Sequence, residues 1–240
     1  ISLMSYKYTY NVGVGGKGTT LTPKSGEYDS VVLFLHGLGD SSSGWAASMP
    51  TLHLEHTKFI LPDAPKRPIT LNGGGQMPGW SDISGLEETS PEDRVGFDES
   101  AARMRLIIDD EMKNHGIASN RIVIGGFSQG GALALHTALR LPHTLAGCVA
   151  LSTWLPFSKE FTDTAKPALS TESTHLPIFQ CHGTDDVVVH YKWGQHTHTL
   201  LKELIPHSKL MTITGMGHSS HPSEMLAVGE FLKNILHVDQ

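Results

Sequence analysis

Short runs of apolar residues recur along the chain and alternate with segments in which apolar and polar residues follow a helical period. Runs that are apolar throughout are typical of strands covered on both faces. They predict buried strands at residues 31–35, 58–61, 122–124, 148–151, 177–182 and 209–213. The stretch 6–10 alternates between the two kinds of residue, which predicts a strand at an edge of the sheet.

The clearest helical pattern spans residues 97–115, where an apolar stripe that includes Met104 and Ile108 ends before Gly116. Further helical patterns cover residues 45–54, 132–141, 191–204 and 222–235. Strands that alternate with helices in this way require a mainly parallel sheet with helices on both faces. The pattern therefore predicts the α/β fold class.

No internal repeat, low-complexity stretch or linker divides the 240 residues, and a chain of this length can bury one large core. We therefore expect a single domain over residues 1–240. Residues 65–91 interrupt the regular pattern, because they are rich in Gly and Pro and follow neither period. An irregular connection of this length inside a compact domain is usually a lid or a binding loop.

Charge and cysteine usage restrict the partners. The formal net charge is −6 and no basic block is present, which argues against nucleic acid and leaves at most a transient contact with a membrane surface. No apolar run approaches the roughly 20 residues needed to span a bilayer. Cys148 and Cys181 both lie in apolar runs, which favours buried free thiols and a reducing compartment. We expect a soluble, cytoplasmic protein.

Residues 126–130 read Gly-Phe-Ser-Gln-Gly and match the G-x-S-x-G pattern of a nucleophile elbow. This elbow is a tight turn between a strand and a helix, and its strained backbone requires residues without side chains two positions before and after the serine. An apolar β-branched run precedes the motif and a small-residue helical pattern follows it. Ser128 is therefore the candidate nucleophile.

A serine hydroxyl is a weak nucleophile, so it needs a base, which in this fold class follows the acid along the chain. His218 lies in a Gly-rich loop directly after the predicted strand 209–213 and is the candidate base. His221 precedes Pro222 and fits better as a residue at the start of a helix. The acid is expected just past strand 177–182, where spacing does not decide between the adjacent Asp185 and Asp186.

Acyl transfer also needs backbone N–H groups that hold an oxyanion. One should belong to Gln129, the residue after the nucleophile. The other should come from the loop after an early strand, and within the Gly-rich loop 36–40 we choose Leu38. An ordinary tight turn is the alternative interpretation of that loop.

The chain contains 15 histidines, which raises the question of a metal site. His196 and His198, or His218 and His221, are close in sequence. However, neither an H-E-x-x-H nor a C-x-x-C spacing is present. We therefore predict no metal and no cofactor.

Six motifs give the chain a family resemblance; they lie at residues 35–40, 78–83, 125–134, 151–156, 182–186 and 216–220. Through them the chain resembles the acyl-protein thioesterase/lysophospholipase/carboxylesterase family of α/β-hydrolases over residues 31–236. The resemblance implies the α/β-hydrolase fold and a triad of Ser128, Asp186 and His218, so it selects Asp186 as the acid. It also supports Leu38 and Gln129 as oxyanion donors.

By the same resemblance, the expected substrates are thioesters that join palmitate to protein cysteines, lysophospholipids and short esters. Three positions depart from the family pattern: Val187 replaces a Pro, Gly217 replaces a Met, and Thr153 replaces a frequent Cys. None is a triad residue, so we expect these departures to affect the substrate range rather than the reaction.

The expected function is hydrolysis of acyl thioesters or esters through an acyl-enzyme, with an acylated protein as the partner. One alternative is a carboxylesterase or lysophospholipase that has no protein substrate. Another is a hydrolase-fold binding protein without turnover. Candidates for an acyl-chain groove are Leu71, Met77, Trp80 and Trp154, and for each of them packing in the core or lid is an equal alternative.

Overall fold

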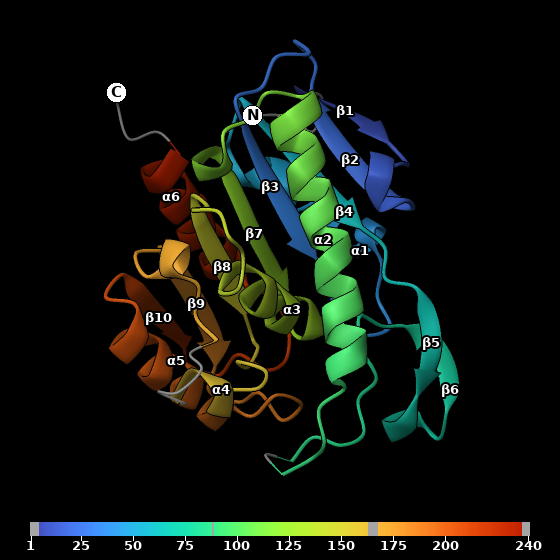
Figure 1. Cartoon of the computed structure of the whole chain (residues 1–240), viewed down its shortest axis with the longest axis vertical. Coiled ribbons are helices and arrows are strands. Elements are labelled where there is room, and N and C mark those ends of the chain that lie inside the picture. Colours follow the sequence, from blue (N-terminus) through green and yellow to red (C-terminus); the bar gives the residue numbers. More distant parts are fainter. Residues whose placement is uncertain (1–4, 88, 163–167, 237–240) are drawn as a thin grey trace.

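The computed structural model of the protein describes residues 5–87, 89–162 and 168–236. Its centre is an eight-stranded sheet in the order β1-β2-β4-β3-β7-β8-β9-β10 (Figure 1). The strands of this sheet are β1 (Tyr6–Thr9), β2 (Gly18–Pro23), β3 (Ser30–Leu35), β4 (Thr57–Pro62), β7 (Ile122–Phe127), β8 (Gly147–Leu151), β9 (Ile178–Gly183) and β10 (Ser208–Ile213). The β1–β2 and β2–β4 pairs are antiparallel and the five other neighbouring pairs are parallel. This arrangement confirms the predicted α/β class, with β1 at an edge.

Helices cover both faces of the sheet (Figure 1). The α-helices are α1 (Ser42–Ala46), α2 (Arg94–Asn114), α3 (Gln129–Ala138), α4 (Lys159–Thr162), α5 (Tyr191–Leu204) and α6 (Pro222–Leu236). Apolar side chains of α2, α3 and α5 join the core on one face, whereas those of α1 and α6 join the core on the other. Two apolar layers therefore enclose the parallel strands, as their apolar sequences predict.

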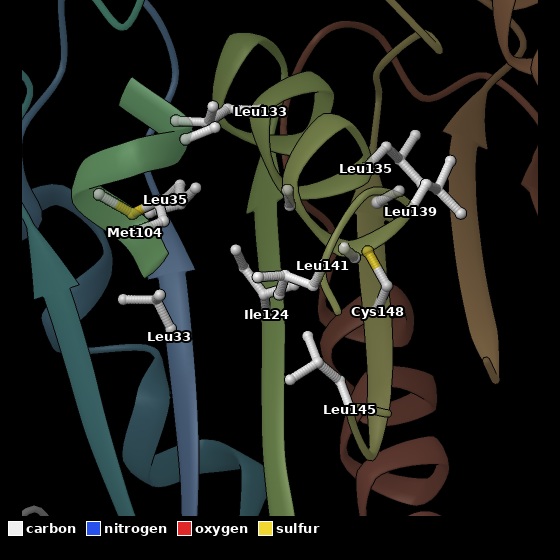
Figure 2. Close-up of a cluster of buried hydrophobic side chains, with 14 of the residues drawn as sticks. Leu33, Leu35, Met104, Ile124, Leu133, Leu135, Leu139, Leu141, Leu145 and Cys148 are labelled. Atoms are coloured by element: carbon white, nitrogen blue, oxygen red, sulfur yellow. The ribbon is translucent and has the colours of Figure 1, made fainter. Parts of the chain in front are cut away.

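The alternation of side chains along β3 shows why this strand is apolar from Val31 to Leu35. Leu33 and Leu35 point to the face that carries α2 and α3, and Val32 and Phe34 point to the face that carries α1 and α6. Figure 2 shows Leu33 and Leu35 beside Met104 of α2. Each of these side chains is almost fully buried, which contributes about 1.5–3 kcal/mol per side chain.

Three predicted helices differ from the structure at their ends. The helix predicted at 132–141 is α3, Gln129–Ala138. The segment predicted as one helix at residues 45–54 is α1 followed by a 3₁₀ turn, Met49–Leu52, because Pro50 has no N–H to continue an α-helical ladder. Helix α2 begins at Arg94 rather than at residue 97. Its N-cap is Asp93, whose side chain accepts a hydrogen bond from the Gly96 N–H at 3.0 Å.

Residues 65–91 are more regular than predicted. They contain an antiparallel hairpin of β5 (Lys66–Ile69) and β6 (Gly75–Pro78), closed through a 3₁₀ turn, Thr70–Asn72. Gly73 and Gly74 have φ values of 61° and 79°, a region in which glycine carries no steric cost. Four-residue strands rich in Pro, Gly and charge show no clear period, so the sequence pattern missed them. Beyond the hairpin, the described residues of this stretch lack strands and helices apart from the bridge of Ile83 to Glu92.

The carboxyl ends of β3, β7, β9 and β10 lie at one edge of the sheet, where open α/β sheets bind their ligands. Cys148 and Cys181 are buried and free, as predicted. Among the described residues, no helix combines the length and the apolar character that crossing a membrane requires.

Candidate active site

Ser128 occupies a strained turn between β7 and α3. Its φ and ψ are 55° and −123°, a conformation that non-glycine residues rarely adopt. A Cβ on Gly126 would lie 2.5 Å from the Gly130 backbone, and a Cβ on Gly130 would collide with the Leu35 carbonyl of the neighbouring strand. The two glycines therefore allow β7 to turn sharply into α3 and present the serine at the strand end.

Ser128, His218 and Asp186 form a continuous hydrogen-bonded chain. The His218 Nε2 lies 3.0 Å from the Ser128 Oγ, and its Nδ1 lies 2.7 Å from the Asp186 Oδ2. Of the two candidate acids, Asp186 contacts His218, whereas Asp185 accepts a hydrogen bond from the Thr184 hydroxyl at 2.7 Å. His221 instead pairs with Ser223 at the start of α6. This geometry suits a nucleophile, a base and a residue that orients the base.

The loops that carry the acid and the histidine are held together by backbone contacts. The Asp185 N–H donates to the Met216 carbonyl at 3.0 Å, and the Thr184 N–H donates to the Ile213 carbonyl at 3.1 Å. A side chain on Gly183 would collide with the Met216 carbonyl, so a glycine at the end of β9 allows the two loops to approach. Backbone contacts between the loops that follow β9 and β10 therefore set the distance from the acid to the histidine.

The Asp186 carboxylate is fully buried yet ionised. Burial alone would raise its pKa, but hydrogen bonds from His182 and His218 and from the Val188 N–H outweigh burial and hold the pKa well below its usual range. The N–H groups of Val188 and Val189 both donate to Oδ1 at 2.9 Å. Asp186 is thus a negative group whose position is fixed from several directions.

The backbone N–H groups of Leu38 and Gln129 are available to a ligand, because neither meets an acceptor within the described residues. His36 helps to orient the first of them. Its Nε2 accepts from the Ala64 N–H at 3.0 Å, so the proton lies on Nδ1, which donates to the Gly37 carbonyl at 2.7 Å. Burial lowers the pKa of His36 and so favours this neutral ring. Since Gly37 O and the Leu38 N–H belong to one trans peptide, fixing the carbonyl turns the N–H the opposite way.

The side chain of Gln129 is a further element that sequence reasoning missed. Its Oε1 accepts from the Trp80 N–H at 2.9 Å, and its Nε2 donates to the Ser81 carbonyl at 2.8 Å. Trp80 in turn donates from its indole N–H to the His36 carbonyl at 2.8 Å. Gln129 therefore ties the segment after β6 to the elbow. The sequence did contain a signal for this role: Gln129 has a long polar side chain, although the expected chemistry uses only its backbone N–H.

A cavity of about 370 Å³ opens beside Ser128 and His218. Leu71 and Trp154, two of the four groove candidates, line it. Met77 and Trp80 do not: Met77 lies on β6, and Trp80 is fully buried, because its large ring packs in the core on the α2 face. For Trp80 the structure therefore shows packing in the core. The walls are largely apolar, and their charged members are all acidic: Asp40, Asp82, Glu87, Glu92 and Asp93.

Glu92 joins two walls of this cavity and was not among the predicted residues. Its carboxylate accepts hydrogen bonds from the Phe157 N–H at 2.8 Å and from the Trp154 indole N–H at 3.3 Å. Burial raises its pKa despite these donors. Glu92 lies in an irregular acidic stretch. A contact between two loops produces no periodic pattern in the sequence, so the sequence did not predict it.

The three departures from the family pattern occupy different surroundings. Thr153 donates its hydroxyl to the Ser128 carbonyl at 2.6 Å, so it supports the elbow. Val187 is 75% exposed, and Gly217 lies in the loop before His218. Within the described chain, three potential metal ligands come together only at Asp110, Glu111 and His115, none of which lines the cavity.

Comparison with known proteins gives a consistent result. A family model described as phospholipase/carboxylesterase matches residues 18–236. Acyl-protein thioesterase 1 of Neurospora crassa is 42% identical over 222 residues, which cover 88% of this chain and 89% of that protein. The protein of the same name from Mycosarcoma maydis is 40% identical over 237 residues, covering 92% of this chain and 97% of its own.

Solved structures agree in fold. The crystal structure of Zea mays acyl-protein thioesterase 2 is similar with a TM-score of 0.81 and 33% identity, covering 90% of this chain and 97% of its own. Arabidopsis thaliana SOBER1 is similar with a TM-score of 0.79 and 32% identity, covering 86% of this chain and 99% of its own. The architecture is therefore the α/β-hydrolase fold.

Proposed function

The chain belongs to the phospholipase/carboxylesterase family of α/β-hydrolase enzymes, and from this premise we propose that it is a serine hydrolase that cleaves acyl thioesters of protein cysteines. Ser128 is the nucleophile, His218 is the base and Asp186 is the acid that orients it. No cofactor takes part in this chemistry.

In the first step, His218 Nε2 removes the Ser128 proton as Oγ attacks the acyl carbonyl. The Leu38 and Gln129 N–H groups stabilise the oxyanion of the tetrahedral intermediate. The intermediate collapses to an acyl-enzyme, and His218 gives its proton to the departing thiolate or alkoxide. His218 then removes a proton from a water that attacks the acyl-enzyme, and gives this proton to Ser128 Oγ as the carboxylic acid leaves. Throughout, the Asp186 carboxylate holds the imidazole in one tautomer and stabilises the imidazolium.

The observation that carries this proposal is the coincidence of three features at one strand edge. The hydrogen-bonded Ser128–His218–Asp186 chain opens onto a largely apolar cavity. The N–H groups of Leu38 in the loop after β3 and of Gln129 at the start of α3 meet no acceptor among the described residues. A binding protein without turnover has no chemical need for all three.

The acyl thioester is preferred as the substrate because the cavity walls are mostly apolar and because three of the four proteins compared above are named acyl-protein thioesterases. Leu71 and Trp154 are proposed to contact the acyl chain. A carboxylesterase or lysophospholipase without a protein substrate is the second candidate, since the family description names phospholipase and carboxylesterase.

We place the enzyme in a reducing compartment such as the cytoplasm, because both thiols are free and buried. Its proposed partner is an acylated protein, approached with at most a transient contact to the membrane that carries the acyl group.

A fluorophosphonate probe tests the reaction. The folded protein should form one adduct on Ser128, located by peptide mass spectrometry, and Ser128→Ala should abolish it. Ser220→Ala, which removes an exposed serine from the histidine loop, serves as the matched control and should label normally. Absence of an adduct in the folded wild-type protein would defeat the catalytic proposal.

Substrate preference is tested by the relative kcat/KM values for a palmitoylated cysteine peptide, lysophosphatidylcholine and a short p-nitrophenyl ester. The proposal expects the palmitoyl peptide to have the largest value. A larger value for the lysophospholipid or the short ester favours the second candidate.

A further inference from the structure

A second histidine contacts the carboxylate of the triad. His182, the penultimate residue of β9, places its Nε2 2.7 Å from the Val189 carbonyl and 3.4 Å from the Asp186 Oδ2. Its side chain is 2% exposed, so water does not compete for these contacts. His182 takes no part in the proton transfers of the proposed reaction.

The two contacts fix the proton of His182. A backbone carbonyl accepts hydrogen bonds and does not donate them, so Nε2 must carry a hydrogen that points to Val189 O. The same N–H lies within reach of Asp186 Oδ2, the oxygen that also accepts from His218. Two histidine rings therefore lie against one carboxylate oxygen: His218 hydrogen-bonds to it at 2.7 Å, and His182, whose N–H points to Val189 O, lies 3.4 Å from it.

His182 also fixes the turn that holds the other carboxylate oxygen. The Val188 and Val189 N–H groups donate to Asp186 Oδ1, and the carbonyl of Val189 is the group that His182 binds. A displacement of the His182 ring would therefore release both the carboxylate and the turn that surrounds it.

Helix α5 has a matching gap for the ring. Gly194 faces His182, and a methyl group at this position would overlap the ring at Nδ1. The Tyr191 ring packs edge-on at 5.9 Å between centroids. The ionisable groups that face His182 are Asp186 in its own loop, Tyr191 on α5 and Glu224 on α6.

We propose that His182 is a positioning residue of the hydrolase that acts through Asp186. It holds the carboxylate and its turn in place, and its N–H stabilises part of the negative charge that would otherwise act on His218. This inference rests on the proposed function for its effect on rate. Its effect on the Asp186–His218 hydrogen bond does not need turnover. The two levels can therefore be tested separately.

The test that needs no turnover measures the pKa of His218 by NMR. The signal observed is that of the proton in the hydrogen bond from His218 to Asp186. His182→Phe keeps an aromatic ring, somewhat larger than imidazole, and removes the donor. With one competing donor gone, more of the carboxylate charge faces His218, and its pKa should rise by about half a unit or more. His182→Gln restores an N–H at the place of Nε2 and should return the pKa toward the wild-type value.

The rate test is fluorophosphonate labelling of Ser128 across pH 5–9. His182→Phe should lower the maximal rate about 10-fold and shift its acid limb to higher pH, in line with the loss expected when a residue that orients a catalytic group is removed. Gly194→Ala keeps His182 but displaces its ring and the N–H that the ring carries. It should therefore change the rate and the pH profile in the same direction as His182→Phe, and by less. His198→Phe is the matched control, because His198 lies on α5 and contacts Gln180 of β9 without touching the triad.

A folded His182→Phe protein with unchanged His218 pKa and unchanged labelling overturns the proposal. So does an equal loss of rate in His182→Phe and His198→Phe without a pKa shift, which would mark a merely structural effect. If His182→Phe does not fold, His182→Gln and Gly194→Ala decide: wild-type behaviour in Gly194→Ala contradicts the proposal. Failure of the wild-type protein to label would refute the proposed reaction, and the NMR comparison would still decide the role of His182.

Discussion

Asp186 and Glu224 are two buried carboxyl groups that both interact with His182, yet their surroundings shift their pKa values in opposite directions. Asp186 is surrounded by N–H donors from His182, His218, Val188 and Val189. Neither carboxylate oxygen of Glu224 has a hydrogen-bond partner within the described residues, although its side chain is fully buried. Burial is common to both groups, so the difference lies in the donors.

The consequence appears in the two pKa values. That of Asp186 is held well below its usual range, whereas burial raises the pKa of Glu224 from 4.5 to about 7, and nearby Cys181 and the His221 backbone offset only part of the rise. Glu224 lies in the first turn of α6, where the helix dipole favours a negative charge. That favourable field is smaller than the cost of burying a carboxylate without partners.

The largest effect is expected when the carboxylate with donors loses its charge. Asp186→Asn should lower kcat by about 10³–10⁴-fold, because a neutral amide neither fixes the His218 tautomer nor stabilises the imidazolium. Ester turnover and fluorophosphonate labelling measure the loss. Asp185→Asn is the control and should stay near wild-type activity. Asp185 is adjacent, but among the described residues its side chain hydrogen-bonds only to the Thr184 hydroxyl. Equal activity in both variants would contradict the assignment of the acid.

An intermediate effect is expected for the carboxyl without donors. A raised folded-state pKa means that the unfolded chain ionises first, so wild-type stability should fall as pH rises from about 4.5 to about 7 and then level off. Glu224→Gln does not titrate. Between pH 5 and pH 8.5 the wild-type protein should therefore lose about 2–3 kcal/mol more than the variant, measured by urea unfolding. Parallel pH curves for the two proteins would show that Glu224 titrates normally.

The smallest effect is expected for a carboxylate that remains in water. Asp109 pairs with Lys113 one turn along α2 at 3.0 Å, and the two side chains are 38% and 70% exposed. Asp109→Asn should change the free energy of urea unfolding by less than about 0.5 kcal/mol, because solvent and salt screen an exposed pair. A change as large as that of Glu224→Gln would mean that burial is not the property that separates these groups.

Several features followed from the sequence alone. The β-branched apolar run, the glycines on both sides of Ser128 and the helical pattern after it are local, and each depends only on neighbouring residues. The same holds for the strands and for His218, which lies in the loop after a strand. Parallel strands carry their carboxyl ends to one edge, so locating the strand ends also located the candidate chemistry.

Only the tertiary structure decided the features that depend on contacts between distant segments. Spacing left Asp185 and Asp186 open and the family resemblance implied Asp186; packing brings Asp186 against His218 and places His182 beside the same carboxylate. Trp80 lies in the core rather than in the cavity. Glu224 is buried without donors. Sequence periodicity records which face of an element is apolar, whereas the charge state of a buried group depends on donors supplied by other elements, and these are fixed only when the sheet and helices pack.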